Sequence, residues 1–224
     1  MATFLELQDL CLSWLDDLDA GYFTRPQLAV WLNNAQRECQ KQLLQAGASE
    51  NWYETTKYGN TVAEQSEYTM PTDFLKVNKF EVVASGTGIN ENKQVLDPVT
   101  TIQLNQQPLQ TGLPAVYGLK KNCFVLKPIP DQIYKIYLTY SYRVVDMTVN
   151  SQVPDVPEQY HEYLPVLAVI DGFFKDTRDV SQFVAAKRDF YIEMMKQDAN
   201  SRRVDFPRTV NSTEDGSWNT GYSF

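Results

Sequence analysis

The sequence predicts an α+β protein in which helix pairs at both ends enclose a β-rich middle. Apolar residues recur every three or four positions in residues 3–45 and again in 159–199, which is the period of an amphipathic helix. Between residues 51 and 144 they tend to alternate, as in strands with one buried face. We expect the helix pairs to form one bundle, with a small antiparallel β domain inserted and an extended C-terminal arm. The predicted divisions are 1–50, 51–150, 151–200 and 201–224.

The chain is long enough to bury a core without a disulfide or a metal. Its 224 residues are 43% hydrophobic and 21% charged, a balance typical of globular proteins rather than disordered chains. A chain of this length buries roughly 70% of its unfolded surface. Its three cysteines are far apart and form no C-x-x-C pair, so we expect reduced thiols. One large domain or two small ones are therefore expected.

Two helices are predicted at the N-terminal end, over residues 3–19 and from residue 24 to a stop at Gly47. Each begins with a capping box, in which two side chains three positions apart bond each other's backbone N–H groups. The second also has Pro26 in its first turn, where a missing N–H has no cost. The capping pairs are Thr3–Glu6 and Thr24–Gln27. The predicted apolar stripes are Phe4, Leu7, Cys11, Trp14 and Leu18, then Leu28, Trp31, Leu32, Ala35, Cys39 and Leu43.

The middle of the chain is predicted to be a series of short strands rich in Val, Tyr and Phe. The longest covers residues 132–144, with one face buried and one face in water. The other strands are expected at 52–58, 67–70, 75–84, 93–96, 115–119 and 123–127. The buried face of the longest holds Tyr134, Ile136, Leu138, Tyr140 and Tyr142; the wet face holds Lys135, Tyr137, Thr139, Ser141 and Arg143.

Two further helices are predicted near the C-terminal end, over residues 159–175 and 181–199. Pro165 either kinks the first of them or lies just after a loose first turn. Its apolar stretch around residues 163–170 is about eight residues long, too short to cross a membrane. The expected stripe of the second helix is Phe183, Val184, Lys187 (through its stem), Tyr191, Met194 and Met195.

The last 24 residues depart from these patterns. They combine Ser, Thr, Asn and Gly with aromatic residues, whereas a plain disordered tail is poor in aromatics. Large aromatic side chains supply much of the contact area in protein interfaces. We therefore interpret 201–224 as an arm that orders on a partner; a frayed terminus is the alternative. The candidate contact residues of the arm are Phe206, Pro207, Trp218, Tyr222 and Phe224.

The net charge of −8 argues against sequence-specific binding of DNA or RNA and against binding to anionic membranes. It does not argue against DNA passing close to the protein.

Searches for catalytic and metal-binding patterns find none. His161 is the only histidine, which rules out the paired histidines of a zinc-protease helix. A Ser-His-Asp triad would have to use it, but no G-x-S-x-G motif is present. We expect His161 to be half-exposed in the first turn of a helix. The acidic run at residues 16–19 lacks the spacing of a calcium loop. Residues 85–88 lack the G-K-[ST] of a phosphate loop and are predicted to be a hairpin tip. The sequence therefore favours assembly over catalysis, with no cofactor and no metal.

Several segments, individually weak, combine into a more specific pattern. They are Thr24-Arg25-Pro26 leading into Trp31-Leu32-Asn33-Asn34-Ala35, residues 68–77 with Met70-Pro71-Thr72-Asp73-Phe74 at their centre, Gly112-x-Pro114-x-x-Tyr117, Leu126-x-Pro128-x-Pro130, residues 134–140, and Val156-Pro157-x-x-Tyr160-His161-x-x-Leu164. Together, from about residue 4 to 199, the chain resembles the head-to-tail adaptor proteins of tailed bacteriophages, the podovirus-type group that includes tail tubular protein A. Pro165 departs from that family's usually unbroken helix.

The resemblance implies a structural virion protein that forms a ring of about twelve copies, joins the portal to the tail and extends the DNA channel. The implied partners are the portal protein, a tail or nozzle protein, further copies of the chain, and double-stranded DNA passing without sequence recognition. The implied location is the head–tail junction, and the host cytoplasm during assembly. Loop contacts with the tail or a neighbour are expected at Gly86, Gly88, Lys120, Lys121 and Asn122.

Two alternatives remain at this point. The first is a cell-wall hydrolase with two carboxylates roughly 5 to 9.5 Å apart. Its candidates, Glu54, Asp73, Glu81 and Asp171, qualify only because they lie near apolar residues, as any carboxylate near a core does. The second is a ring protein lower in the tail that does not touch the portal.

Overall fold

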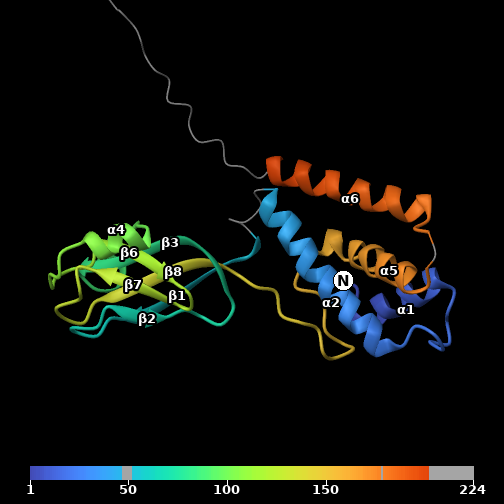
Figure 1. The fold of residues 1–224 in the computed structure, drawn as a ribbon, viewed down its shortest axis with the longest axis horizontal. Helices are drawn as coiled ribbons and strands as arrows, with labels where there is room; N and C mark the ends of the chain where they lie inside the picture. Colours follow the sequence, from blue (N-terminus) through green and yellow to red (C-terminus); the bar gives the residue numbers. More distant parts are fainter. Residues whose placement is uncertain (47–51, 178, 202–224) are drawn as a thin grey trace, which may run out of the picture.

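A computed structural model describes residues 1–46, 52–177 and 179–201, with side chains to residue 198. Figure 1 shows two parts side by side, one of helices and one of strands, joined by two crossings of the chain. The predicted α+β class is confirmed. Gly47, the expected stop of the second helix, lies outside the described residues.

Four helices make up the helical part: α1 (Phe4–Leu15), α2 (Arg25–Gln45), α5 (Tyr163–Lys175) and α6 (Gln182–Ser201). Helix α5 contacts the other three. It is apolar on most sides, as a helix surrounded by others must be. Gly172 allows the close approach of α1, because a Cβ there would lie 2.8 Å from Leu15 Cδ2.

Both N-terminal helices begin where the sequence predicts. Thr3 and Glu6 form the expected capping box, and the Gln27 side chain accepts the Thr24 N–H. The first helix ends earlier than predicted, at Leu15, because Asp16 adopts a left-handed conformation with φ 57°. Asp17 then accepts three backbone N–H groups of the following turn, from residues 21–23. Leu18 is therefore 74% exposed, and its predicted place in the core stripe is wrong.

The β part contains two four-stranded sheets rather than one small sheet. The first has the order β1-β8-β3-β4 and the second β2-β7-β6-β5. All pairs are antiparallel except β5–β6, which is parallel. A short helix α4 (Thr101–Gln106) lies between β5 and β6, two strands of the second sheet. The strands are β1 (Glu54–Asn60), β2 (Glu67–Thr69), β3 (Phe74–Ser85), β4 (Asn92–Val95), β5 (Asp97–Pro98), β6 (Val116–Lys120), β7 (Cys123–Lys127) and β8 (Lys135–Tyr142).

The two sheets share a core of their own. Phe80 of β3 meets Phe124 of β7 edge-to-face at 4.8 Å, and the predicted buried face of β8 points into the same cluster. One residue of the predicted wet face of β8 departs from expectation. Ser141 is fully buried, and its hydroxyl donates to the Asn78 side-chain oxygen of the adjacent strand at 3.2 Å.

Two predictions for the C-terminal helices change in the structure. Pro165 does not kink α5, since it lies in the first turn of that helix, after a single turn of 3-10 helix at Glu158–Tyr160. The first residue of the predicted α6 stripe, Phe183, is 70% exposed, so that assignment is wrong. The rest of the predicted stripe faces the helical core: Val184, Tyr191 and Met195 are buried, Met194 packs against them, and Lys187 lies over the Trp14 ring.

Three amide side chains of α2 hold the returning chain between the two parts. Asn33, Gln36 and Gln40 occupy one helix face at spacings of three and four, and all are buried. Each both donates and accepts. Gln40 bonds Tyr142 C=O (2.7 Å) and Val144 N–H (3.2 Å); Gln36 bonds Val145 C=O (2.7 Å) and Asp155 N–H (2.9 Å); Asn33 bonds Met147 C=O (3.0 Å) and Met147 N–H (2.8 Å). We call these three residues the amide row.

Replacing the central member of the amide row tests its importance. Gln36→Leu leaves the partly buried Val145 C=O and Asp155 N–H without this partner, and the loss of a partner by a buried group costs about 1–3 kcal/mol. We expect the free energy of unfolding to fall by about 2–4 kcal/mol, measured by urea denaturation. Gln45→Leu, at the exposed end of the same helix, is the matched control and should change it by less than about 0.5 kcal/mol. Equal stability of the two variants would contradict the structural role of the row.

Candidate interaction site

The predicted loop contacts separate into two groups at opposite ends of the β part. Gly86 and Gly88 directly follow the last residue of β3. Lys121 and Asn122 line a cavity of about 380 Å³ together with residues near the first residue of β3. Because β3 has 12 residues, roughly 40 Å separates its ends. The structure therefore does not bring these five loop residues into one surface.

The distal turn depends on a glycine. Gly86 has φ +88°, and a Cβ there would lie 2.0 Å from the Asn90 carbonyl oxygen. Gly88 also has a positive φ, of 62°, but no atom lies within 4 Å of its Cβ position. The turn shape thus requires glycine at the first position much more strictly than at the second.

The other loop, between β6 and β7, lies beside the junction of the two parts. The Asn122 carbonyl accepts the Met70 N–H at 3.0 Å, and Lys120 pairs with Glu67 of β2 at 2.8 Å. Arg143, just after β8, lines the same cavity as Lys121 and Asn122. This loop is therefore placed by the segment that connects β2 to β3.

That connecting segment contains Asp73, which ties three strands together. Its carboxylate accepts the Tyr140 hydroxyl of β8 at 2.9 Å and the Lys57 ammonium of β1 at 3.2 Å. Its carbonyl accepts the Arg143 N–H at 2.7 Å. Partial burial alone would raise the pKa of Asp73, but the hydrogen bonds from Tyr140 and Lys57 hold this pKa below its usual value.

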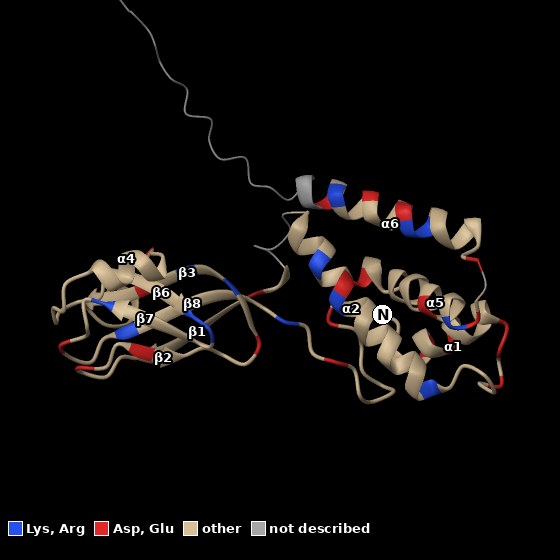
Figure 2. Cartoon of the chain, viewed as in Figure 1, with Lys and Arg blue, Asp and Glu red and all other residues tan. Residues whose placement is uncertain are grey.

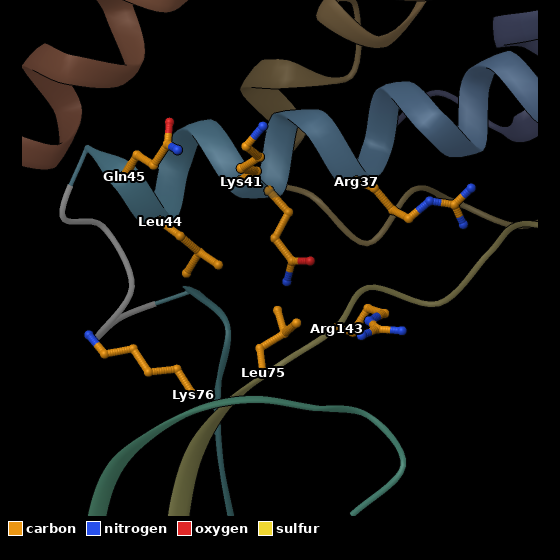
Figure 3. Close-up of a pocket in the computed structure, with 8 residues that line it drawn as sticks. Arg37, Lys41, Leu44, Gln45, Leu75, Lys76 and Arg143 are labelled. Carbon is orange, nitrogen blue, oxygen red and sulfur yellow. The ribbon is translucent and has the colours of Figure 1, made fainter. Parts of the chain in front are cut away.

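An open cleft of about 470 Å³ lies between α2 and the start of the β part (Figure 3). Helix α2 supplies Arg37, Gln40, Lys41, Leu44 and Gln45, and the β side supplies Leu75, Lys76 and Arg143. The two leucines point toward each other across the cleft in Figure 3. We call this the junction cleft.

The charge of the junction cleft is opposite to that of the whole chain. It is lined by four basic residues and by no acidic one, although the net charge is −8. Figure 2 shows basic residues on α2 and on the chain that faces it. Arg37 pairs with Asp146, and Lys41 pairs with Glu38 at 3.5 Å. Lys76 and Arg143 form no ion pair with any residue whose side chain the structure places.

A second exposed surface lies on the outer face of α6. Phe183 and Phe190 are seven positions apart, so they share one face of the helix, and they are 70% and 62% exposed. Large exposed aromatic side chains close together often mark interaction surfaces. The sequence pattern places Phe183 in the buried stripe of this helix, so it does not predict an exposed aromatic face here. The arm residues Phe206, Pro207, Trp218, Tyr222 and Phe224 lie outside the described residues.

His161 is buried, not half-exposed as expected. It is 4% exposed; its Nδ1 accepts the Ala2 N–H at 3.3 Å, and its Nε2 lies 3.0 Å from the Val156 carbonyl. These partners require Nε2–H to donate to Val156 and leave Nδ1 unprotonated. Burial lowers the pKa of His161. The residue therefore joins the N-terminus to the start of α5 and has a structural position.

The carboxylates considered for hydrolysis have separate structural partners. Asp73 bonds Tyr140 and Lys57, Glu81 pairs with Lys79 at 2.8 Å, and Glu54 accepts the Asn78 amide at 2.9 Å. Asp171 belongs to α5, in the helical part. Within residues 1–46, 52–177 and 179–201, no group of three or more His, Cys, Asp or Glu side chains could hold a metal ion. Over the same residues, no helix is long and apolar enough to cross a membrane.

Comparison with protein families assigns the chain. The model of the SU10 adaptor protein family matches residues 2–214, nearly the whole sequence. The chain belongs to the SU10 adaptor protein family. The expected relation to phage head-to-tail adaptors is confirmed, and the protein is a structural adaptor of a bacteriophage. Comparison with curated proteins finds no match.

In this SU10 adaptor, two of the segments that carried the resemblance contribute residues to the junction. Asp73 comes from the Met-Pro-Thr-Asp-Phe segment, and Asn33 from the segment that begins α2. The sequence did not single out Gln36 and Gln40. Their spacing was visible, but amides on a helix face beside an apolar stripe look the same whether water or a buried chain covers them.

Removing the Asp73 side chain should weaken the β part of the adaptor. Asp73→Ala leaves the Tyr140 hydroxyl without its acceptor, and we expect a loss of about 1–3 kcal/mol in the free energy of unfolding, measured by chemical denaturation. Asp9→Ala, which removes an exposed ion pair with Arg25, should have a much smaller effect because exposed pairs contribute little. Similar losses in both variants would contradict the assigned role.

The buried histidine should make the adaptor sensitive to mild acid. Its folded pKa lies below its unfolded pKa of about 6.5, so in the window between them only the unfolded chain takes up the proton. This contribution to stability is complete above about pH 6.5 and decreases as the pH falls below it. In His161→Asn, the decrease between about pH 7 and 5.5 should be smaller than in the wild type, measured by thermal unfolding. Parallel pH curves would contradict this.

Proposed function

We propose that this adaptor forms a ring that joins the portal to the tail and extends the DNA channel. The ring is closed and has about twelve copies, as the family resemblance implies. The observation that carries the proposal is the family match over residues 2–214. It is supported by two surfaces suited to protein partners, the α6 face and the aromatic arm. In this ring the helix pairs form the body, and the β part projects toward the tail or a neighbour.

A ring requires two different faces of one subunit to meet, because its contacts are head-to-tail rather than two-fold symmetric. The exposed Phe183 and Phe190 of α6 provide one such face in this proposal. The net charge of −8 supports a channel along which DNA slides, since like charges repel the phosphates. The protein acts without catalysis, cofactor or metal, in the virion at the head–tail junction.

The arm, predicted as residues 201–224, is proposed to bind the portal through Phe206, Pro207, Trp218, Tyr222 and Phe224. Sedimentation velocity of the adaptor mixed with the portal protein of the same virus tests this. We expect co-sedimentation at about one adaptor per portal subunit. Migration of the two proteins as separate species would contradict portal binding, and would favour a ring lower in the tail.

A set of aromatic substitutions identifies the part of the chain responsible. Trp218→Ala, Tyr222→Ala and Phe224→Ala together should weaken portal binding by about tenfold or more, since aromatic anchors dominate interface energies. The matched control removes three exposed apolar side chains of the β part, by Tyr58→Ala, Leu109→Ala and Ile133→Ala. Unchanged binding by the arm variant would defeat the arm proposal.

A further inference from the structure

Among the described residues, nothing covers the apolar and basic groups of the junction cleft. Leu75 is 37% exposed, and Leu44 is half-buried on the opposite wall. Lys76 and Arg143 lie beside these leucines with no acidic partner among the described side chains. A complementary occupant would bring apolar, preferably aromatic, side chains between the leucines and carboxylates to the two basic groups.

We propose that residues 209–224 of the same chain occupy this cleft in the free subunit. This stretch contains Glu214 and Asp215, and it contains no Lys or Arg. Its aromatic residues are Trp218, Tyr222 and Phe224. The preceding stretch, 202–208, has three arginines and one acid, so it is a poor match for a basic cleft. Charge complementarity therefore selects the distal part of the segment.

The path from α6 to the cleft is short enough. Figure 1 shows the C-terminal end of α6 beside the C-terminal end of α2, and these two helices are in contact. Twelve residues lie between Ser201 and Glu214, so thirteen Cα–Cα steps give an extended reach of roughly 43 Å. Helix α2 itself, with 21 residues, is roughly 32 Å long. The segment can therefore reach any of the α2 residues that line the cleft without leaving its own subunit.

Occupation of the cleft would join the two parts of the subunit by a third connection. Carboxylates near Lys76 and Arg143 gain charge-assisted contacts, and an aromatic ring between Leu44 and Leu75 removes apolar surface from water. The same aromatic residues are those proposed above to bind the portal. The inference is connected to the proposed function only through these shared residues. If both proposals hold, binding to the portal displaces the segment from the cleft.

Photo-crosslinking in the full chain tests the occupant. Trp218 is replaced by p-benzoylphenylalanine, and equal amounts of unlabelled and ¹⁵N-labelled protein are mixed before irradiation. We expect adducts on the peptides that contain Leu44 or Leu75, with both joined peptides carrying the same isotope. Adducts that join the two isotopes would overturn the proposal in favour of a neighbouring copy. Adducts elsewhere, or none, would also overturn it.

Charge reversal supplies the second test. Lys76→Glu with Arg143→Glu should lower the yield of cleft adducts by about tenfold, and Glu214→Lys with Asp215→Lys added to that variant should restore it. Lys79→Glu, which changes an exposed base on the same strand outside the cleft, is the matched control and should leave the yield unchanged. Thermal unfolding of each variant confirms that it is folded.

If the folded variant with Lys76→Glu and Arg143→Glu gives the same yield of cleft adducts as the wild type, the proposal is overturned. Because no portal protein is present in either test, the result is separate from portal binding. A subunit whose segment occupies the cleft but does not bind the portal would retain this inference and lose the proposed function.

Discussion

Burial of the returning backbone between the two parts is the constraint on which this subunit depends. Once the chain leaves β8 it runs along α2, and its backbone polar groups that bond the amide row are buried or partly buried. A buried C=O or N–H without a partner costs about as much as several good contacts contribute. The amide row forms hydrogen bonds with the backbone of five residues from one helix face. Each of its amides both donates one hydrogen bond and accepts one. Apolar side chains of the same size could cover this segment but could not hold it in register.

The placement of the β part follows from that register. Tyr142 lies at the boundary, where it packs against both apolar cores and donates its hydroxyl to Asp155 at 3.2 Å. Asp73 then links β1, β3 and β8 within a few residues of the same point. A structural adaptor has to keep its two ends in a defined relation to each other. The hydrogen bonds that would maintain this relation are gathered at the junction rather than spread over the sheets.

The distribution of charge over the surface shows why the net charge alone does not predict what a given site binds. A chain of charge −8 is expected to repel polyanions on average. Nevertheless the junction cleft is lined by basic groups only, two of them without ion-pair partners among the described side chains. Within a Debye length of about 10 Å the local groups decide what a surface attracts. The cleft is therefore basic and the distal C-terminal segment acidic, so the two are opposite in charge although the whole protein is acidic.

The sequence by itself determined the α+β class, both capped helix starts, most strands and the family. These features depend on local rules: a cap is satisfied within four residues, and a period of 2 or 3.6 follows from backbone geometry. Only the tertiary structure decided what covers each face. Leu18 and Phe183 match an apolar stripe yet are exposed, while Ser141, His161 and Gln36 are polar yet buried. Periodicity identifies a face, but its burial depends on segments more than a hundred residues away, as when Val145 and Asp155 reach Gln36.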